Sequence, residues 1–76
     1  MNPEEAMGRI MAEYARAARL HARFNSAHEG YAVIYEEMDE LWEEVKQNRA
    51  RRSSDRLRKE AIQAAAMLMR FIVDLL

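Results

Sequence analysis

The stretch Leu57–Leu76, LRKEAIQAAAMLMRFIVDLL, decides the fold, because apolar residues recur along it at steps of three and four. That spacing is typical of an α-helix. One apolar face, expected to pack within the chain, consists of Leu57, Ala61, Ala64, Leu68, Phe71, Ile72 and Leu75. At about 100° per residue, a second set falls nearly opposite and consists of Ile62, Ala66, Met69, Val73 and Leu76. A helix that is apolar on two sides needs cover on two sides.

A second helix is predicted immediately upstream, from Ser26 to about Asn48. Ser26 and Glu29 match a capping box, in which a serine hydroxyl and a glutamate satisfy the free amide groups of the first turn. An apolar stripe at helical spacing, expected to face the core, consists of Tyr31, Ile34, Tyr35, Met38, Leu41, Trp42 and Val45.

The N-terminal part of the chain predicts one more helix, from about Pro3 to Phe24, because proline suits a first turn and the apolar spacing is again helical. Its expected core stripe consists of Met7, Ile10, Met11, Tyr14, Ala17, Ala18 and His21. The C-terminal helix begins at about Asp55, with Ser53 or Ser54 as its cap. The fold class is therefore all-α, with three helices and two short turns.

The length of the chain limits its core. Its 76 residues form one domain, 1–76, whose core alone supplies only a few kcal/mol of net stability. Three helices do not easily cover both apolar sides of the last helix. We therefore expect the chain to complete a four-helix-type bundle by homo-oligomerisation, as a dimer or a tetramer. The alternative is a frayed C-terminal helix with exposed apolar residues.

Composition narrows the class of function. A net charge of −1 is not that of a typical nucleic-acid binder, although arginines and a lysine gather between Arg49 and Lys59. The absence of cysteine excludes disulfides and thiolate zinc sites. No apolar run approaches the roughly 20 residues that span a bilayer, and no signal sequence stands at the N-terminus. We expect a cytoplasmic protein that has no membrane partner.

Three glutamates and a glutamine form two short rungs at helical spacing. Glu37 with Glu40, and Glu60 with Gln63, are three residues apart and project side by side. Antiparallel packing would bring the two rungs face to face, and such oxygen-rich clusters suit Mg²⁺ or Mn²⁺. Glu60 lies at the margin of an apolar face and should be half-buried. The alternatives are a solvated acidic face, or a salt bridge from Glu60 to an arginine of the first helix.

Three segments carry a resemblance to a known family. They are SAHEGYAVI at 26–34, EEMDELWEEV at 36–45 and KEAIQAAA at 59–66. Together they resemble the MazG-like all-α nucleoside triphosphate pyrophosphohydrolases, over about the last two thirds of the chain. That family carries E-E-x-x-E on one helix and E-x-x-D on the next, which coordinate Mg²⁺. The resemblance implies cleavage of a nucleoside triphosphate to a monophosphate and pyrophosphate, in a dimer or tetramer with composite sites.

Carried over by position, the resemblance makes Glu37, Glu40 and Glu60 metal ligands. Glu36 becomes the candidate catalytic residue, as an orienter of the attacking water or a further ligand. The fourth ligand position holds Gln63 where the family has aspartate, and an amide oxygen brings no charge. Either the site is degraded, or it recruits another carboxylate from the set Asp39, Glu44 and Asp74.

Two hypotheses follow, and the sequence leaves both open. The first is a Mg²⁺-dependent hydrolase of nucleoside triphosphates, in which Tyr35 or Trp42 is a candidate for the wall of a base pocket. The second is a non-catalytic oligomerisation module, adaptor or nucleotide sensor. Histidines are interpreted more simply, with His21 as a core residue and His28 as a surface or capping residue. Nucleic-acid binding is a weaker third hypothesis, because the acidic face opposes it.

Overall fold

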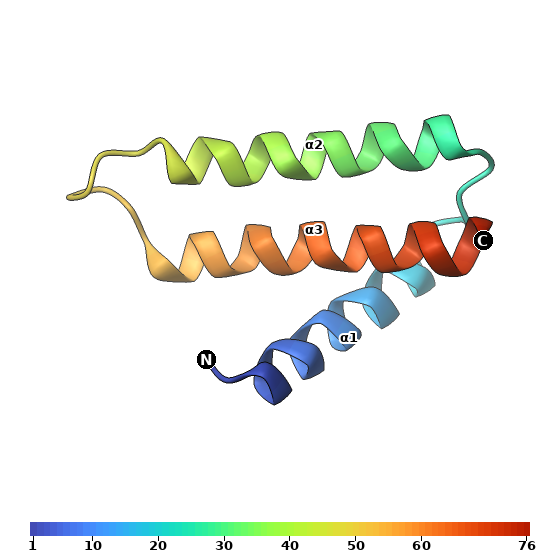
Figure 1. Cartoon of the computed structure of the whole chain (residues 1–76), viewed down its shortest axis with the longest axis horizontal. Coiled ribbons are helices and arrows are strands. Elements are labelled where there is room, and N and C mark those ends of the chain that lie inside the picture. The colour runs from blue at the N-terminus through green and yellow to red at the C-terminus, as the bar shows by residue number, and fades with distance from the viewer.

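The structure, a computed structural model, describes residues 1–76 and contains three α-helices and no strand. They are α1 (Pro3–Leu20), α2 (Ala27–Val45) and α3 (Ser54–Leu75). Helices α2 and α3 form an antiparallel hairpin, and α1 crosses α3 at an angle (Figure 1). Both α1 and α2 pack on α3 but not on one another. The predicted all-α class is confirmed, and none of the three helices has the length and apolarity needed to span a membrane.

Side-chain caps fix where each helix begins. Asn2 Oδ1 accepts a hydrogen bond from the amide of Glu5 at 2.9 Å, and Pro3 stands in the first turn. Ser26 Oγ accepts from the Glu29 amide at 3.1 Å, as the capping box predicts. The Glu29 carboxylate, however, bonds the backbone and side chain of Asn25 rather than the amide of Ser26. The predicted starts of all three helices therefore hold to within a residue.

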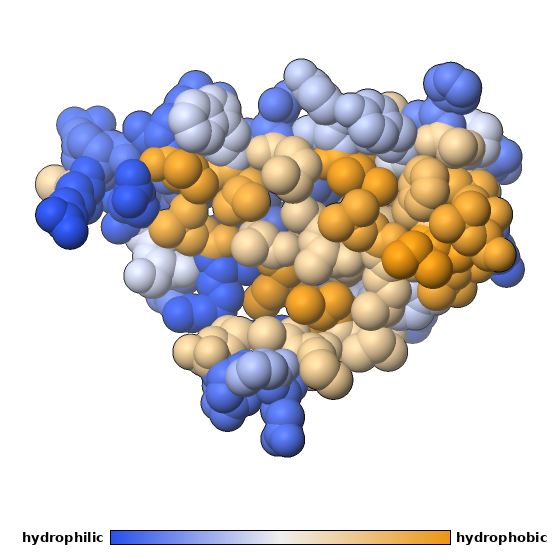
Figure 2. Space-filling model, viewed as in Figure 1, coloured by the Kyte–Doolittle hydropathy of each residue, from blue (hydrophilic) through white to orange (hydrophobic).

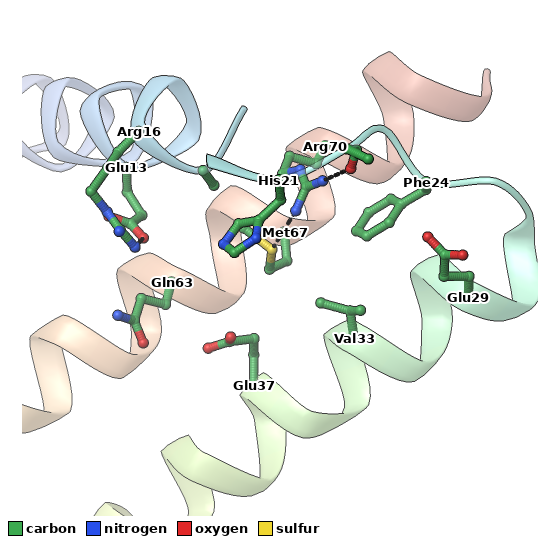
Figure 3. Close-up of a pocket in the computed structure, with 12 residues that line it drawn as sticks. Glu13, Arg16, His21, Phe24, Glu29, Val33, Glu37, Gln63, Met67 and Arg70 are labelled. Carbon is green, nitrogen blue, oxygen red and sulfur yellow. Dashed lines mark hydrogen bonds and ion pairs between the residues drawn. The ribbon is translucent and has the colours of Figure 1, made fainter. Parts of the chain in front are cut away.

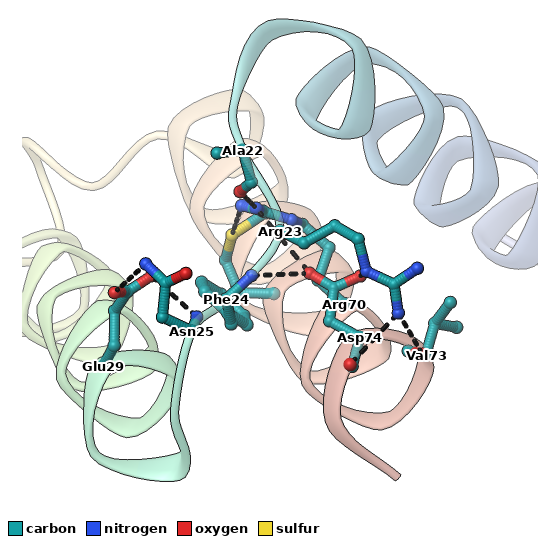
Figure 4. Close-up of polar contacts among 9 residues, drawn as sticks. Ala22, Arg23, Phe24, Asn25, Glu29, Arg70, Val73 and Asp74 are labelled. Carbon is teal, nitrogen blue, oxygen red and sulfur yellow. Dashed lines mark hydrogen bonds and ion pairs between the residues drawn. The ribbon is translucent and has the colours of Figure 1, made fainter.

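Helix α1 ends at Leu20, four residues before the predicted end. It stops there because side chains of α3 form hydrogen bonds with the backbone groups that the next helical turn would use (Figure 4). Arg70, only 4% exposed, donates from Nη2 to the carbonyl oxygen of Ala22 at 2.8 Å. Its guanidinium carbon lies 4.4 Å from the centre of the Phe24 ring. The Asp74 carboxylate accepts from the Phe24 amide at 3.0 Å. These bonds hold the linker between α1 and α2, residues 21–26, against α3.

Arg23, in the same linker, forms further hydrogen bonds with α3. Its Nη2 donates to the carbonyl oxygens of Val73 and Asp74, at 3.3 and 3.1 Å, in the last turn of α3 (Figure 4). A cation at this end of a helix satisfies free carbonyls and favours the helix dipole. The C-terminal end of α2 is held similarly, because Arg52 donates to the Val45 carbonyl at 2.8 Å. Helix α2 therefore stops three residues before its predicted end.

The core lies where α1, the linker and α3 meet. Its buried members are Ala17, Phe24, Ala66 and Met67, flanked by half-buried Tyr14, Val33, Ile34, Phe71 and Leu75. Gly30 is buried and lets α2 approach α3, because a Cβ there would lie 2.7 Å from Cδ2 of Phe71. The core is small for three helices, since most of it comes from alanines and only a few large side chains.

The predicted assignment of the apolar faces is wrong on all three helices. On α3, Leu68 and Ile72 were predicted to pack within the chain but are 49% and 60% exposed, and on α1 the predicted core residues Met7 and Met11 are more than half exposed. Ala66, predicted to await a second chain, is fully buried beside Ala17 of α1. The α2 stripe, predicted to face the core, is largely exposed, with Tyr31, Tyr35 and Trp42 each more than half accessible to solvent. Other residues give the hairpin broad apolar areas, coloured orange in Figure 2. Periodicity identified the stripes, but not the neighbour that covers each one.

Candidate metal centre

Three carboxylates from two helices meet on the α2–α3 hairpin. Glu37 and Glu40 are one turn apart on α2, and Glu60 lies opposite them on α3. One oxygen atom from each can be chosen such that all three lie within 4.8 Å of one another. Antiparallel packing brings the two acidic rungs together, as predicted. This proximity is unfavourable unless protons or a cation offset the charge.

Two of these carboxylates are poorly satisfied. Glu37 and Glu60 are half-buried, and Oε2 of each is buried without a hydrogen-bond partner. Burial, followed by the charges of Glu40 and Glu60, raises the pKa of Glu37 to about 7. Burial and the charge of Glu40 also raise the pKa of Glu60, while Lys59 acts against this rise. The expected half-burial of Glu60 is confirmed, and no arginine of α1 forms a salt bridge with it.

The residues proposed to complete the site lie in different places. Gln63 is half-buried and lines the same cleft as Glu37, whereas Glu36 is exposed and outside the three-carboxylate cluster. Asp39 is also exposed, and lies about 200° around α2 from Glu37. Asp74 is 14 residues from Glu60 along α3, which is about 21 Å, and it holds the linker instead.

Glu44 is the one alternative carboxylate that remains near the cluster. It is half-buried on the same side of α2, and its charge contributes to the raised pKa of Glu60. Its Oε2 atom accepts a hydrogen bond from Nε of Arg56 at 2.9 Å. To serve as a fourth ligand, Glu44 would have to share its charge with this arginine. The arginines near the turn mainly hold the turn itself, since Arg52 and Arg56 also donate to backbone carbonyls there.

A cleft opens beside the carboxylates and is lined by residues of α1, α2 and α3 (Figure 3). Its volume is about 290 Å³. Glu37 and Gln63 point into it from α2 and α3 (Figure 3). The apolar part of its wall consists of Ala17, Ala22, Phe24, Val33 and Met67. The cleft exists because α1 and α2 do not pack on one another.

A basic groove continues from this cleft between α1 and α3. Arg9, Arg16 and Lys59 line it, together with Glu13, Ala12, Ile62 and Gln63. Arg16 Nη2 lies 2.6 Å from Oε1 of Glu13, and this hydrogen bond is the main reason why the pKa of Glu13 is lowered. Arg9 and Lys59 form no ion pair. Lys59 therefore has a charge that acts on Glu60 of the cluster, and Arg9 is a second unpaired cation in the groove.

Sequence reasoning missed the contribution of α1 to this region. Glu13 and Arg16 line both cavities, and their three-residue spacing is the only sign of a pair that the sequence offers. His21, predicted in the core, is exposed and lines the cleft. Tyr35 and Trp42, considered for a base pocket, line neither cavity.

The comparisons with known proteins add no assignment to this geometry. No protein-family model, no curated protein and no solved structure matches the chain.

Proposed function

We propose that this protein is a metal-dependent hydrolase of nucleoside triphosphates, similar in activity to the pyrophosphohydrolases that its sequence resembles. The observation that carries the proposal is the pair of buried, unpartnered carboxylate oxygens on Glu37 and Glu60, beside Glu40. Buried polar atoms are normally hydrogen-bonded, and those that are not require an explanation. A divalent cation would contact all three carboxylates at once and offset two of their three charges.

The donor set fits Mg²⁺ or Mn²⁺. Carboxylate oxygens are the ligands that these hard cations prefer, and the amide oxygen of Gln63 is a further neutral donor nearby. When bound, such a cation supplies charge for phosphate oxygens and lowers the pKa of a water molecule. The side chains of Glu37, Glu40 and Glu60 would hold it, and Glu36 remains the candidate for orienting water.

The surroundings of the cluster suit a nucleotide. Arg9 and Lys59 are free to bind phosphate oxygens, which arginine and lysine both recognise by charge-assisted hydrogen bonds. The adjoining cleft offers the Phe24 ring and the side chains of Val33 and Met67 to an apolar or planar group. Its volume of about 290 Å³ is at the lower end for ligand sites. A triphosphate along the groove would leave its nucleoside beside this cleft.

The test is a calorimetric titration of Mg²⁺ and Mn²⁺ into the protein, followed by assays of pyrophosphate release from nucleoside triphosphates. Glu60→Gln removes one charged ligand at constant volume, and Asp39→Asn removes an exposed charge on the other side of α2. We expect saturable metal binding and turnover that Glu60→Gln abolishes and Asp39→Asn preserves. If the wild type binds neither cation even with nucleotide present, the proposal is wrong.

Gln63 favours a second candidate, a nucleotide sensor without turnover. With only three charged ligands, the cluster should hold a divalent cation more weakly than four carboxylates would. The substitution Gln63→Asp separates the two candidates. A sensor gains metal affinity and begins to hydrolyse nucleotide, whereas an enzyme adapted to Gln63 already has turnover. Metal and nucleotide binding without pyrophosphate release in the wild type would identify the sensor.

We also propose that the protein works as a homo-oligomer. The chain exposes 13 large hydrophobic side chains, among them Tyr31, Trp42 and Ile72. Scattered apolar residues are normal on a protein surface, but extensive patches mark interaction sites. Sedimentation at micromolar concentration tests this proposal, and a folded monomer would contradict it.

A further inference from the structure

We infer that two copies of the chain pair through the face of the α2–α3 hairpin that lies opposite the cleft, so that each copy keeps a complete cluster and cleft of its own. This inference rests on the proposed self-association and adds to it the surface, the pairing and the position of the site. It does not depend on metal binding. We call the surface the hairpin face, and it consists of Tyr31, Tyr35, Met38 and Trp42 of α2 with Ala61, Ala65, Leu68 and Ile72 of α3.

The hairpin face has a regular spacing. Its four residues on α2 follow at steps of four, three and four, and its four residues on α3 follow at the same steps. This is the spacing of the apolar seam in coiled coils and four-helix bundles. Both seams lie opposite the cleft that α2 and α3 share, and therefore along one side of the hairpin. The surface is therefore built for packing against other helices at a shallow angle.

The hairpin face and the cleft lie on opposite sides of the hairpin. Cleft residues Glu29, Val33 and Glu37 of α2 are each two positions from Tyr31 or Tyr35, which corresponds to about 200° around the helix. On α3, Gln63 is two positions from both Ala61 and Ala65, and Arg70 is two positions from both Leu68 and Ile72. Helix α1 also borders the cleft, so it does not cover the hairpin face.

The hairpin face is exposed and uncharged. Tyr31 is 65% exposed, Ile72 is 60% and Trp42 is 57%, while Leu68 and Met38 are about half exposed. None of the eight residues carries a charge, so covering them requires no desolvation of ions. Tyrosine, tryptophan and methionine are enriched at protein interfaces, and tryptophan and tyrosine often dominate their binding energy.

The area of the chain matches what a dimer requires. Its accessible surface is 5633 Å², whereas a compact monomer of 8.9 kDa should expose about 4,800 Å². The radius of gyration is 13.1 Å, against about 11 Å for a compact domain of this length. The excess surface is about 800 Å², which is close to the area that each partner loses in a standard protein interface.

A second copy is the occupant that these features favour. In a two-fold dimer the same patch meets itself, and two apolar hairpins pair to give a four-helix bundle. The net charge of −1 gives little repulsion between copies. Because the cleft faces away from this interface, the partner contributes no residue to the carboxylate cluster. This arrangement differs from the composite sites that the sequence resemblance implies.

The test compares two substitutions that place a charge on an exposed apolar position. Leu68→Glu lies in the hairpin face, and Met7→Glu lies on α1, outside it. Sedimentation equilibrium should give a wild-type dimer at micromolar concentration. A buried, unpaired charge in each copy should weaken the Leu68→Glu dimer by at least about 100-fold, while Met7→Glu should leave it unchanged. Circular dichroism checks that both variants remain helical.

Trp42 provides a second measurement that needs no substitution. It is the only tryptophan of the chain and lies in the hairpin face, so its emission should shift to shorter wavelength as the wild-type protein is concentrated. A wild-type protein that stays monomeric with an unshifted spectrum overturns the inference and leaves the face to a different protein. A Leu68→Glu variant that remains a dimer places the interface elsewhere and also overturns it.

Mg²⁺ titration of the Leu68→Glu monomer tests whether each copy has a complete site. Wild-type affinity in the helical monomer is the expected result. Loss of binding in a helical monomer would mean that the site is shared between copies and would overturn that part of the inference. If the wild type itself binds no metal, the proposed function fails, while the pairing is still decided by sedimentation.

Discussion

Replacing Glu37 with glutamine should make the metal-free protein more stable while removing its metal binding. Glu37 is crowded by two other carboxylates and has a buried oxygen without a partner. Its pKa in the folded chain is about 7, so the folded state holds a proton there at a pH where the unfolded chain has lost it. Glutamine has nearly the same volume and no charge. The substitution therefore removes repulsion without creating a cavity.

The magnitude follows from the raised pKa. A rise from 4.5 to about 7 corresponds to at most about 3.4 kcal/mol of unfavourable free energy once the group is ionised. Because Glu37 is only half-buried, solvent screens part of this, and we expect about 1 to 2 kcal/mol. The contribution of protonated Glu37 to wild-type stability is fully present below the pKa of the unfolded chain, and it is lost as the pH rises through the pKa of the folded chain. Glu37→Gln should thus stabilise the protein at about pH 8 and have little effect at about pH 5.

Urea unfolding at both pH values, with and without Mg²⁺ and at one protein concentration, measures this effect. In thermal unfolding of a domain of this size, a change of 1 kcal/mol in the free energy of unfolding corresponds to a shift of about 4 to 8 °C in Tm. Mg²⁺ should stabilise the wild type but not Glu37→Gln, since a ligand stabilises only the state that binds it. Asp39→Asn, which removes an exposed charge from the same helix, should show neither effect. Equal destabilisation by Glu37→Gln at both pH values would refute the reasoning.

Packing in the core gives two further predictions. Gly30→Ala should destabilise the chain by about 1 to 3 kcal/mol, because the new Cβ would lie 2.7 Å from Phe71. Gly8 has open space around it, so Gly8→Ala should stabilise α1 by about 0.5 to 1 kcal/mol. Similar midpoints of urea unfolding for the two variants would contradict this packing. Arg70→Met should cost about 1 to 3 kcal/mol, because the part-buried hydrogen bond from Arg70 to the carbonyl of Ala22 is lost. Thermal unfolding with an unchanged Tm would show that water replaces the arginine.

Local rules predicted the helices well. Ser26 and Ser53 cap helices where their hydroxyls were expected to act, because capping depends on neighbours within three residues. The end of α1 could not be predicted in this way. Residues up to Phe24 have helical spacing, but Arg70 and Asp74 bind the backbone of the linker from far along the chain. A long-range contact of this kind leaves no signal in the local sequence.

The candidate site was predicted only in its acidic part. The spacing of Glu37, Glu40 and Glu60 indicated two rungs that face one another, and the structure brings them together. The same reasoning placed the aromatic stripe of α2 in the core, since a single helix cannot reveal which neighbour covers which side. The covered side of α2 carries Gly30, Ile34 and Leu41 together with Glu37, and Trp42 is exposed. The basic groove depends on α1 crossing α3, which no local pattern encodes.

The hydrogen bonds between the linker and α3 also have a consequence for how the chain folds during synthesis. The groups that hold residues 22–24 come from Arg70 and Asp74, 48 and 50 residues further along the chain. Helix α1 is thus made first but has no place to dock until most of α3 has left the ribosome. The α2–α3 hairpin depends on contacts closer in sequence and can form at the same stage. The hydrogen bonds that hold the linker therefore cannot form before residues 70–74 have been made.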